Sequence, residues 1–160
     1  MSGWRITPLP DARLTEAWPL VHLRHPTWTL DTWLGEARTL MAESGPAGLF
    51  AAETSAGYIF AVCGFIVDGA AGELFLPLVV STRWRGSDDP LKRLTTAVEA
   101  IGREHGCRSV SVNAPAITAA GDLARWERFG YEWCDHALRK DLLESRPPAR
   151  QGDIGSHACP

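Results

Sequence analysis

The feature that most constrains the fold is an apolar run that ends in a loop rich in arginine and glycine. Residues 74–80 read Leu-Phe-Leu-Pro-Leu-Val-Val. A run without polar alternation is typical of a strand that is buried on both faces, in the middle of a sheet. A polar loop over 81–90 follows, and apolar residues then recur at helical spacing over 91–101. The pattern predicts a central strand that leads directly into an amphipathic helix.

The rest of the chain predicts a mixed order of helices and strands. The expected elements are a strand at 4–6, helices at 14–25 and 29–45, strands at 49–53, 58–67 and 74–80, a helix at 91–105, a strand at 110–113, a helix at 122–129 and a strand at 131–138. With 160 residues, of which 45% are hydrophobic, the chain can bury one core. We therefore expect one α/β domain over residues 3–143. Residues 144–160 carry two adjacent prolines and few apolar side chains, which predicts a disordered tail.

Composition argues against several classes of partner. The formal net charge is -3 and no stripe of Lys and Arg occurs, so we expect neither a nucleic acid nor a membrane as partner. The first residues lack the pattern of a secretory signal, and no run of about 18 apolar residues occurs, which predicts a cytoplasmic location. The four cysteines stand singly, which indicates thiols. His22 and His25 have no third ligand near them in the sequence, so no metal is expected.

Three local patterns, in the right order, carry a resemblance to a known family. They are Leu78-Val79-Val80 followed by Gly86, then His105-Gly106-Cys107, and then the run Trp126-Glu127-Arg128-Phe129-Gly130-Tyr131. With the order of elements, they make the chain resemble the GNAT superfamily of N-acetyltransferases. The resemblance covers nearly all of residues 3–143. It implies an α/β fold with a mixed, mostly antiparallel central sheet flanked by helices.

The resemblance also implies a site for acetyl-coenzyme A (acetyl-CoA) as cosubstrate. The family holds the pyrophosphate of this coenzyme with a Gln/Arg-x-x-Gly-x-Gly/Ala loop and the helix start that follows, where free N–H groups favour anions. The cofactor-binding residues that it implies here are Leu78, Val79, Val80, Arg83, Arg85, Gly86, Ser87, Asp88, Asn113 and Trp126.

The loop departs from the family pattern in its last position. Asp88 replaces the small residue, and Asp89 follows it. One carboxylate about 5 Å from a phosphate costs on the order of 3 kcal/mol at an effective dielectric near 20. The cations Arg83, Arg85, Lys92 and Arg93 could compensate for this repulsion. Alternatively, Asp89 is simply the helix cap, with Pro90 in the first helical position, and no ligand is needed.

The chemistry of acetyl transfer needs a base for the amine, which in the resembled family is often a carboxylate on the fourth strand. Glu73 is the only carboxylate of that strand here, and alternation would place it on one face with Phe75, Pro77 and Val79. Pro77 predicts a bulge or a splay, because a proline leaves a gap in the ladder. The family's tyrosine acid is replaced by Trp126, which leaves water, Tyr131 or no group to protonate the thiolate.

Two functions remain open from the sequence. The first is an acetyl-CoA-dependent N-acetyltransferase (an acyltransferase) that acts on an amine of a small molecule or a protein. The second is a catalytically silent binding or regulatory module of the same fold, favoured by the departures at Pro77, Asp88-Asp89 and Trp126. The amine acceptor is not identified, and the sequence leaves a homodimer open.

Overall fold

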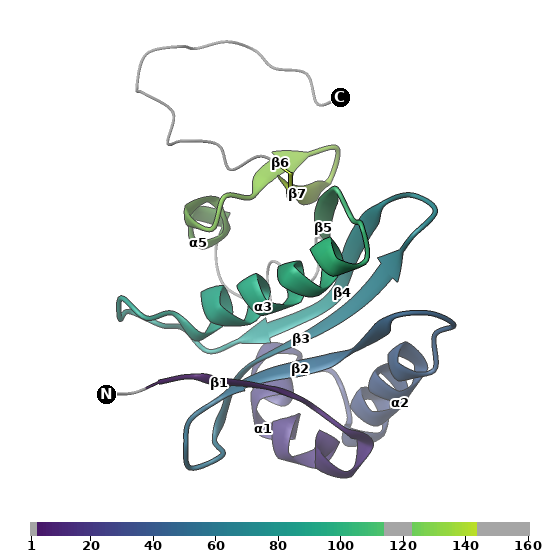
Figure 1. The fold of residues 1–160 in the computed structure, drawn as a ribbon. Coiled ribbons are helices and arrows are strands. Elements are labelled where there is room, and N and C mark those ends of the chain that lie inside the picture. Colours follow the sequence, from purple (N-terminus) through teal and green to yellow (C-terminus); the bar gives the residue numbers. More distant parts are fainter. Residues whose placement is uncertain (1–2, 114–122, 144–160) are drawn as a thin grey trace.

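A seven-stranded sheet runs through the middle of the molecule in the computed structural model, which describes residues 3–113 and 123–143 (Figure 1). The strand order is β1-β2-β3-β4-β5-β7-β6. The strands are β1 (Arg5–Pro8), β2 (Ala47–Glu53), β3 (Ile59–Asp68), β4 (Glu73–Ser81), β5 (Ser109–Asn113), β6 (Glu132–Cys134) and β7 (Ala137–Asp141). Neighbouring strands are antiparallel except β4 and β5, which are parallel. The predicted mixed, mostly antiparallel sheet is confirmed.

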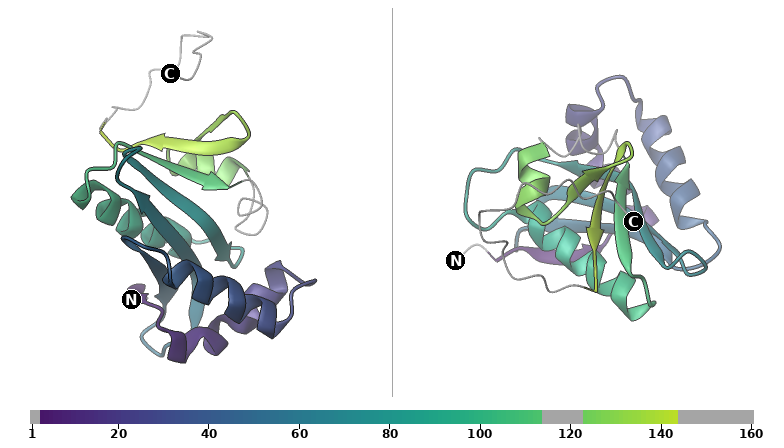
Figure 2. Two further views of the ribbon diagram at one scale, coloured as in Figure 1. Left: turned by 90° about the vertical axis from the view of Figure 1, so that its right-hand side faces the viewer. Right: turned by 90° about the horizontal axis from the view of Figure 1, so that it is seen from above.

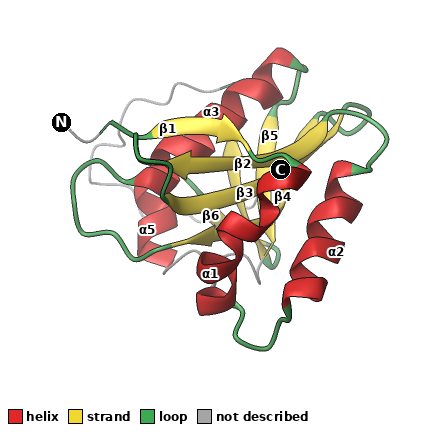
Figure 3. Ribbon diagram, turned by 90° about the horizontal axis from the view of Figure 1, so that it is seen from below, coloured by secondary structure: helices red, strands yellow, loops and turns green. Residues whose placement is uncertain are grey.

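Helices cover both faces of this sheet. On one face lie α1 (Leu14–Arg24), which a short 3-10 turn precedes, and α2 (Leu30–Met41). On the other face lie α3 (Pro90–Glu104) and α5 (Leu123–Arg128). Figures 2 and 3 show the strands between these two layers of helices. Each interface has its own apolar cluster, because inward-facing residues of the strands alternate between the two layers.

Helix α2 lies close to the sheet because β3 carries a glycine beneath it. The Thr29 side chain caps α2 by accepting a hydrogen bond from the N–H of Thr32 at 3.1 Å. A Cβ placed on Gly64 would clash with Leu40 of α2 and would lie 3.3 Å from Leu49. Gly64 therefore leaves room for the Leu40 side chain between α2 and β3.

A bulge divides β4 into two halves that face opposite ways. Opposite Gly64 and Ile66 of β3, the register of β4 shifts by one extra residue at Leu76 and Pro77, which confirms the irregularity predicted from the proline. Leu76 packs in the cluster beneath α3, and Val79 packs there as well. The expectation that Val79 shares a face with Pro77 was wrong, because the extra residue reverses the alternation beyond the bulge.

Other differences from the sequence-based expectations lie near the ends of the chain. The single strand expected at 131–138 is a hairpin of β6 and β7, in which Asp135 and His136 adopt positive φ angles of 43° and 70° and reverse the chain. Cys63 and Cys107 are buried thiols, whereas Cys134 is disulfide-bonded, which its spacing did not indicate. The expected tail at 144–160 lies outside the described residues. None of the helices in residues 3–113 and 123–143 has both the length and the apolar character of a membrane span.

Candidate functional site

The part of β4 beyond the bulge has no strand on one of its sides. Pairing with β5 ends at Leu76, although β4 continues to Ser81. The N–H of Thr82 bonds to the carbonyl of Phe60 on β3 at 3.0 Å. Because N–H groups alternate between the two sides of a strand, those of Val79 and Ser81 point to the unpaired side. In the described part of the chain, this open edge of β4 lacks a neighbouring strand.

The loop after β4 leads into α3 through an aspartate cap. Oδ1 of Asp89 accepts a 2.9 Å hydrogen bond from the N–H of Leu91, and Pro90 begins the helix. The cap predicted as an alternative is confirmed, and it occupies one N–H group that a phosphate could use. The N–H groups of Gly86 and Ser87 bond to none of the described residues, and both residues are exposed. The loop thus still offers free donors.

Each of the two loop carboxylates has an arginine of its own. Asp88 accepts a hydrogen bond from Nε of Arg93 at 2.8 Å. Asp89 accepts two from Arg125, from Nε at 2.8 Å and from Nη2 at 2.6 Å. Neither carboxylate is therefore an uncompensated negative charge beside the loop. Arg93 is one of the four compensating cations that the sequence suggested, whereas Arg125 is not among them.

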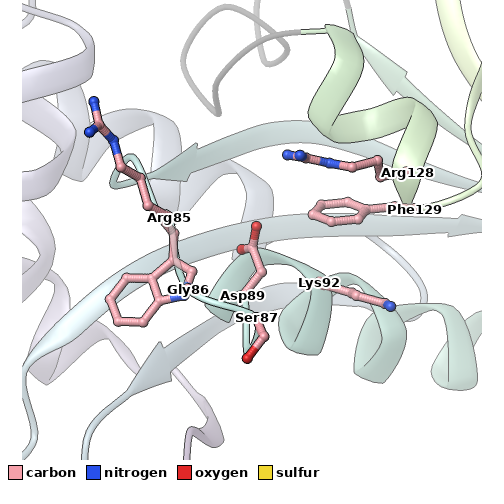
Figure 4. Close-up of a pocket in the computed structure, with 8 residues that line it drawn as sticks. Arg85, Gly86, Ser87, Asp89, Lys92, Arg128 and Phe129 are labelled. Carbon is pink, nitrogen blue, oxygen red and sulfur yellow. The ribbon is translucent and has the colours of Figure 1, made fainter.

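A cavity of about 490 Å³ opens between the loop, the start of α3 and the end of α5. Its lining residues are Trp84, Arg85, Gly86, Ser87, Asp89, Lys92, Arg128 and Phe129. Figure 4 shows Arg128 and Phe129 reaching from the end of α5 toward the loop, while Arg85 points away from them. Within residues 3–113 and 123–143, none of the three lining cations forms an ion pair. Such a cavity favours an anion.

Further arginines gather where β4 ends. Arg24, at the end of α1, donates from Nε to the carbonyl of Ser81 at 2.7 Å. From the opposite layer, Arg125 donates to Oγ of Ser81 at 3.2 Å and to the carbonyl of Thr82 at 3.1 Å. Burial, together with the charges of Arg83 and Arg125, lowers the pKa of Arg24 below its ordinary value. The end of β4 is therefore a positively charged part of the molecule.

A second cavity, of about 340 Å³, lies against the bulge on the side of α2. Its lining residues are Trp28, Glu36, Thr39, Leu40, Glu43, Ile66, Pro77, Leu78 and Asn113. Glu36 lies on α2, and Glu43 lies two residues beyond the end of that helix at Met41. Neither carboxylate has a hydrogen bond or an ion pair in the described part of the chain. The Trp28 ring stacks on His25 with centroids 4.3 Å apart. Carboxylates and an aromatic ring together suit a cation.

The predicted cofactor residues fall into three groups. Arg85, Gly86 and Ser87 line the first cavity, whereas Leu78 and Asn113 line the second. Val79 and Val80 are buried in opposite clusters, and Arg83 is exposed. Trp126 lies in the apolar cluster beneath α3, is fully buried and lines neither cavity. Asp88 is held by Arg93 at the loop.

Glu73, the predicted base, lies apart from both cavities. It begins β4, opposite Asp68 of β3 and Ser109 of β5. At about 3.3 Å per residue, it stands about 13 Å before Pro77 along the strand. The structure does not bring it together with the other predicted residues.

Tyr131 does not face the loop. Its side chain is buried, and its hydroxyl donates a 2.8 Å hydrogen bond to Glu99 of α3. Burial and the nearby Glu99 carboxylate raise the pKa of Tyr131 well above its ordinary value. Of the candidates for protonating a thiolate, Tyr131 is thus unsuited, because its proton is both held and inaccessible.

Sequence reasoning missed Arg24, Arg125 and the two glutamates of the second cavity, Glu36 and Glu43. In the helix expected over 29–45, the spacing of Glu36, Leu40 and Glu43 would place all three on one face, which could have drawn attention to the glutamates. No local pattern marks Arg125, because its carboxylate lies 36 positions away. Among the described residues, no three His, Cys, Asp or Glu side chains come together as a metal site.

Comparison with solved structures identifies the fold. A GNAT family acetyltransferase from Brucella melitensis in complex with acetyl-CoA is 20% identical, with a TM-score of 0.60, over 98% of this chain and 97% of that one. Aminoglycoside 6'-acetyltransferase type Ii is 16% identical, with a TM-score of 0.69, over 89% and 99%. A GNAT family N-acetyltransferase from Escherichia coli in complex with CoA is 15% identical, with a TM-score of 0.63, over 89% and 83%.

The sequence itself has no such match. No protein-family model matches it, and no curated protein is significantly similar to it. The structural likeness extends over 98% of this chain in the first of these structures and 89% in the second. The chain therefore has the GNAT fold, which confirms the resemblance seen in its sequence.

Proposed function

We propose that this chain, with its GNAT fold, transfers an acetyl group from acetyl-CoA to an amine. One observation carries the proposal: the cavity beside the β4–α3 loop is lined by Lys92 and Arg128, which form no ion pair with any described residue, while both loop carboxylates are neutralised by other arginines. An anion-binding cavity at this loop is what the pyrophosphate of the coenzyme would require. Structural neighbours with this fold contain acetyl-CoA or CoA.

The residues present fit the coenzyme. The phosphates would be held by Lys92, by Arg128 and by the N–H groups of Gly86 and Ser87, which bond to none of the described residues. The open edge of β4 would accept the amide groups of the pantetheine arm, because backbone donors and acceptors there have no strand partner among the described residues. When bound, the coenzyme supplies an acetyl group activated as a thioester.

The second cavity supports an acceptor with a positive charge. It lies against Pro77 and Leu78, where β4 and β5 separate, so an amine in it would approach the open edge of β4. Glu36 and Glu43 attract an ammonium group and can accept its proton directly or through water, which leaves the neutral amine that must attack. Glu73 stays a second candidate for the base, acting through a chain of water molecules.

The N–H of Val79 on the open edge is suited to stabilise negative charge on the reacting carbonyl oxygen. It points to the unpaired side of β4, two residues beyond the bulge. A fixed backbone donor in this position needs no rearrangement as charge develops, and such donors contribute about 3–4 kcal/mol to catalysis in other enzymes. Water would supply the proton for the thiol of the coenzyme, since the Tyr131 hydroxyl is held by Glu99.

The test of coenzyme binding is calorimetric titration with acetyl-CoA. We expect micromolar affinity, and a loss of about tenfold to a hundredfold in Lys92→Met and in Arg128→Met, because a hydrogen bond to a charged group contributes about 1.5–3 kcal/mol. Arg108→Met is the matched control, since Arg108 is exposed and lines neither cavity. Equal affinity in all four proteins would contradict binding at this loop.

The test of acetyl transfer is release of free thiol from acetyl-CoA with a panel of amines. We expect turnover with cationic amines, a loss of kcat/KM in Glu36→Gln or Glu43→Gln, and no loss in the exposed control Glu104→Gln. The same assay with Glu73→Gln decides whether that residue takes part. Absence of turnover with every amine, despite tight coenzyme binding, would overturn the enzymatic proposal.

The alternative function, a silent binding module, is favoured by one observation. Arg24 already bonds to the carbonyl of Ser81 on the open edge of β4, where a pantetheine arm would lie. If the unmodified protein and an Arg24→Met variant both fail to bind acetyl-CoA, the fold serves another purpose here, and the search should turn to protein partners.

A further inference from the structure

We propose that Arg125 makes the β4–α3 loop accept phosphate groups by neutralising Asp89, the residue that caps α3. This inference rests on the proposed function, and it concerns what controls the binding of the coenzyme. Arg125 does not line the cavity, whereas Asp89 does. Arg125 is therefore a positioning residue, which acts on the ligand only through the carboxylate.

The contact between the two side chains is of the strongest kind that proteins form. Both oxygens of Asp89 accept hydrogen bonds from Arg125, at 2.6 Å and 2.8 Å, in the parallel arrangement of a guanidinium and a carboxylate. The side chain of Arg125 is 5% exposed, and that of Asp89 is 12% exposed. Water therefore screens the charges little, and the guanidinium itself must cancel the negative charge.

Asp89 has a structural role at the start of α3. Its Oδ1 also accepts a hydrogen bond from the N–H of Leu91, so the same carboxylate caps the N-terminus of α3. A capping aspartate places a negative charge at the edge of the cavity that should receive phosphates. At about 5 Å and an effective dielectric near 20, an uncompensated charge would weaken phosphate binding about a hundredfold. The chain keeps the cap and cancels its charge.

Arg125 also fixes where the carboxylate lies. Arg125 also donates to Oγ of Ser81 and to the carbonyl of Thr82, at the end of β4. One side chain thus joins α5, the end of β4 and the start of α3. The other loop carboxylate, Asp88, has no comparable role, because it is 37% exposed and its partner Arg93 is 64% exposed. Solvent already screens that pair.

The test is a double-mutant cycle with Arg125→Met and Asp89→Asn, read by calorimetry with CoA and, separately, with inorganic pyrophosphate. We expect Arg125→Met to weaken both ligands about a hundredfold. Asp89→Asn keeps the cap, since asparagine caps helices as well as aspartate, and should bind at least as tightly as the unmodified protein. The double variant should recover to within about fivefold of the unmodified protein, because it carries neither the charge nor its partner.

The cycle separates an electrostatic role from a purely structural one. If Arg125 only holds the elements together, the double variant will bind as weakly as Arg125→Met, and the proposal is overturned. Arg125→Lys, which keeps the charge but loses the paired geometry, guards against a variant that fails to fold and should bind more tightly than Arg125→Met. Raising the salt concentration should narrow the gap between Arg125→Met and the double variant.

The two ligands separate this inference from the proposed function. If the unmodified protein binds pyrophosphate but transfers no acetyl group, the enzymatic proposal fails while the cycle still decides the role of Arg125. If acetyl transfer occurs and Arg125→Met binds CoA normally, only this inference fails. If neither ligand binds to the unmodified protein, the loop accepts no phosphate and the inference is overturned as well.

Discussion

The hydroxyl of Tyr131 donates a 2.8 Å hydrogen bond to Oε1 of Glu99, which ties the start of the C-terminal hairpin to the middle of α3. Both side chains are buried, and Nζ of Lys140 approaches the same carboxylate at 3.1 Å. The hydroxyl that could have served as a proton donor is thereby committed to the core. We expect Tyr131→Phe to lower the free energy of unfolding by about 1–3 kcal/mol, because Glu99 loses a buried partner.

In the folded protein, the same Tyr131→Phe variant should keep its kcat for acetyl transfer within about twofold. The measurement is chemical denaturation together with the thiol-release assay below the melting temperature. A large fall in kcat without loss of stability would show that Tyr131 does supply a proton.

Asp88→Gly restores the small residue that the GNAT loop pattern has in this position. Because Asp88 is already paired with the exposed Arg93, removing it should change affinity for acetyl-CoA by no more than about fivefold. Titration of this variant beside Arg93→Met checks the expectation. A gain of a hundredfold in Asp88→Gly would mean that Arg93 does not compensate for the carboxylate.

Gly64→Ala should disturb the acceptor cavity through packing alone. The added Cβ would clash with Leu40, which lines that cavity, and would lie 3.4 Å from Leu78. We expect a loss of about 1–3 kcal/mol in stability and a higher KM for the amine. Gly35→Ala is the control, since nothing lies within 4 Å of its Cβ, and it should stabilise α2 by about 0.5–1 kcal/mol. Thermal unfolding that ranks the two variants in the opposite order would contradict this account of α2.

Glu53 predicts a loss of stability in acid. Burial would raise the pKa of Glu53, but hydrogen bonds from Arg13 and Arg5 at 2.8 Å and 2.7 Å outweigh it and leave the pKa below its ordinary value. A lowered pKa in the folded state stabilises the protein above the unfolded pKa of about 4.3, and this contribution is lost as the pH falls through the folded pKa.

Denaturation of the unmodified protein and Glu53→Gln at pH 7 and pH 3 measures this contribution. The variant should be less stable at pH 7, and the gap should shrink at pH 3. Glu104→Gln, an exposed glutamate without an ion pair in the described chain, should show no gap at either pH. A constant gap for Glu53→Gln would assign its effect to shape rather than charge.

The elements that are determined by residues close together in the chain could be predicted from the sequence. Helix α3 has its apolar face, Asp89 as cap and Pro90 in the first position, all within a few residues. Pro77 predicted the bulge in β4, since a proline has no N–H to donate to a neighbouring strand. The hairpin at Asp135 was missed because a turn with two positive φ angles normally signals itself with asparagine or glycine, and neither occurs there.

The site was less predictable than the fold because its contacts join distant parts of the chain. The loop was found from its pattern, and three of its predicted residues line the first cavity. Arg125 looks like an ordinary charged residue of a short helix, and only the packing of α5 against the end of β4 brings it to Asp89. Likewise, Glu36 meets Pro77 across a cavity that no spacing in the sequence could reveal.

The edge of β4 that lacks a neighbouring strand among the described residues has a consequence for the thermal stability of the protein. A molecule that forms hydrogen bonds with the backbone between Pro77 and Ser81 would extend the sheet there. It would bind only the folded state, because the unfolded chain has no such edge. At a concentration a hundred times its dissociation constant, such a ligand adds about 2.7 kcal/mol to the free energy of unfolding. The melting temperature of this protein would then rise with the concentration of its ligand. At a low ligand concentration, a larger fraction of the chains would be unfolded.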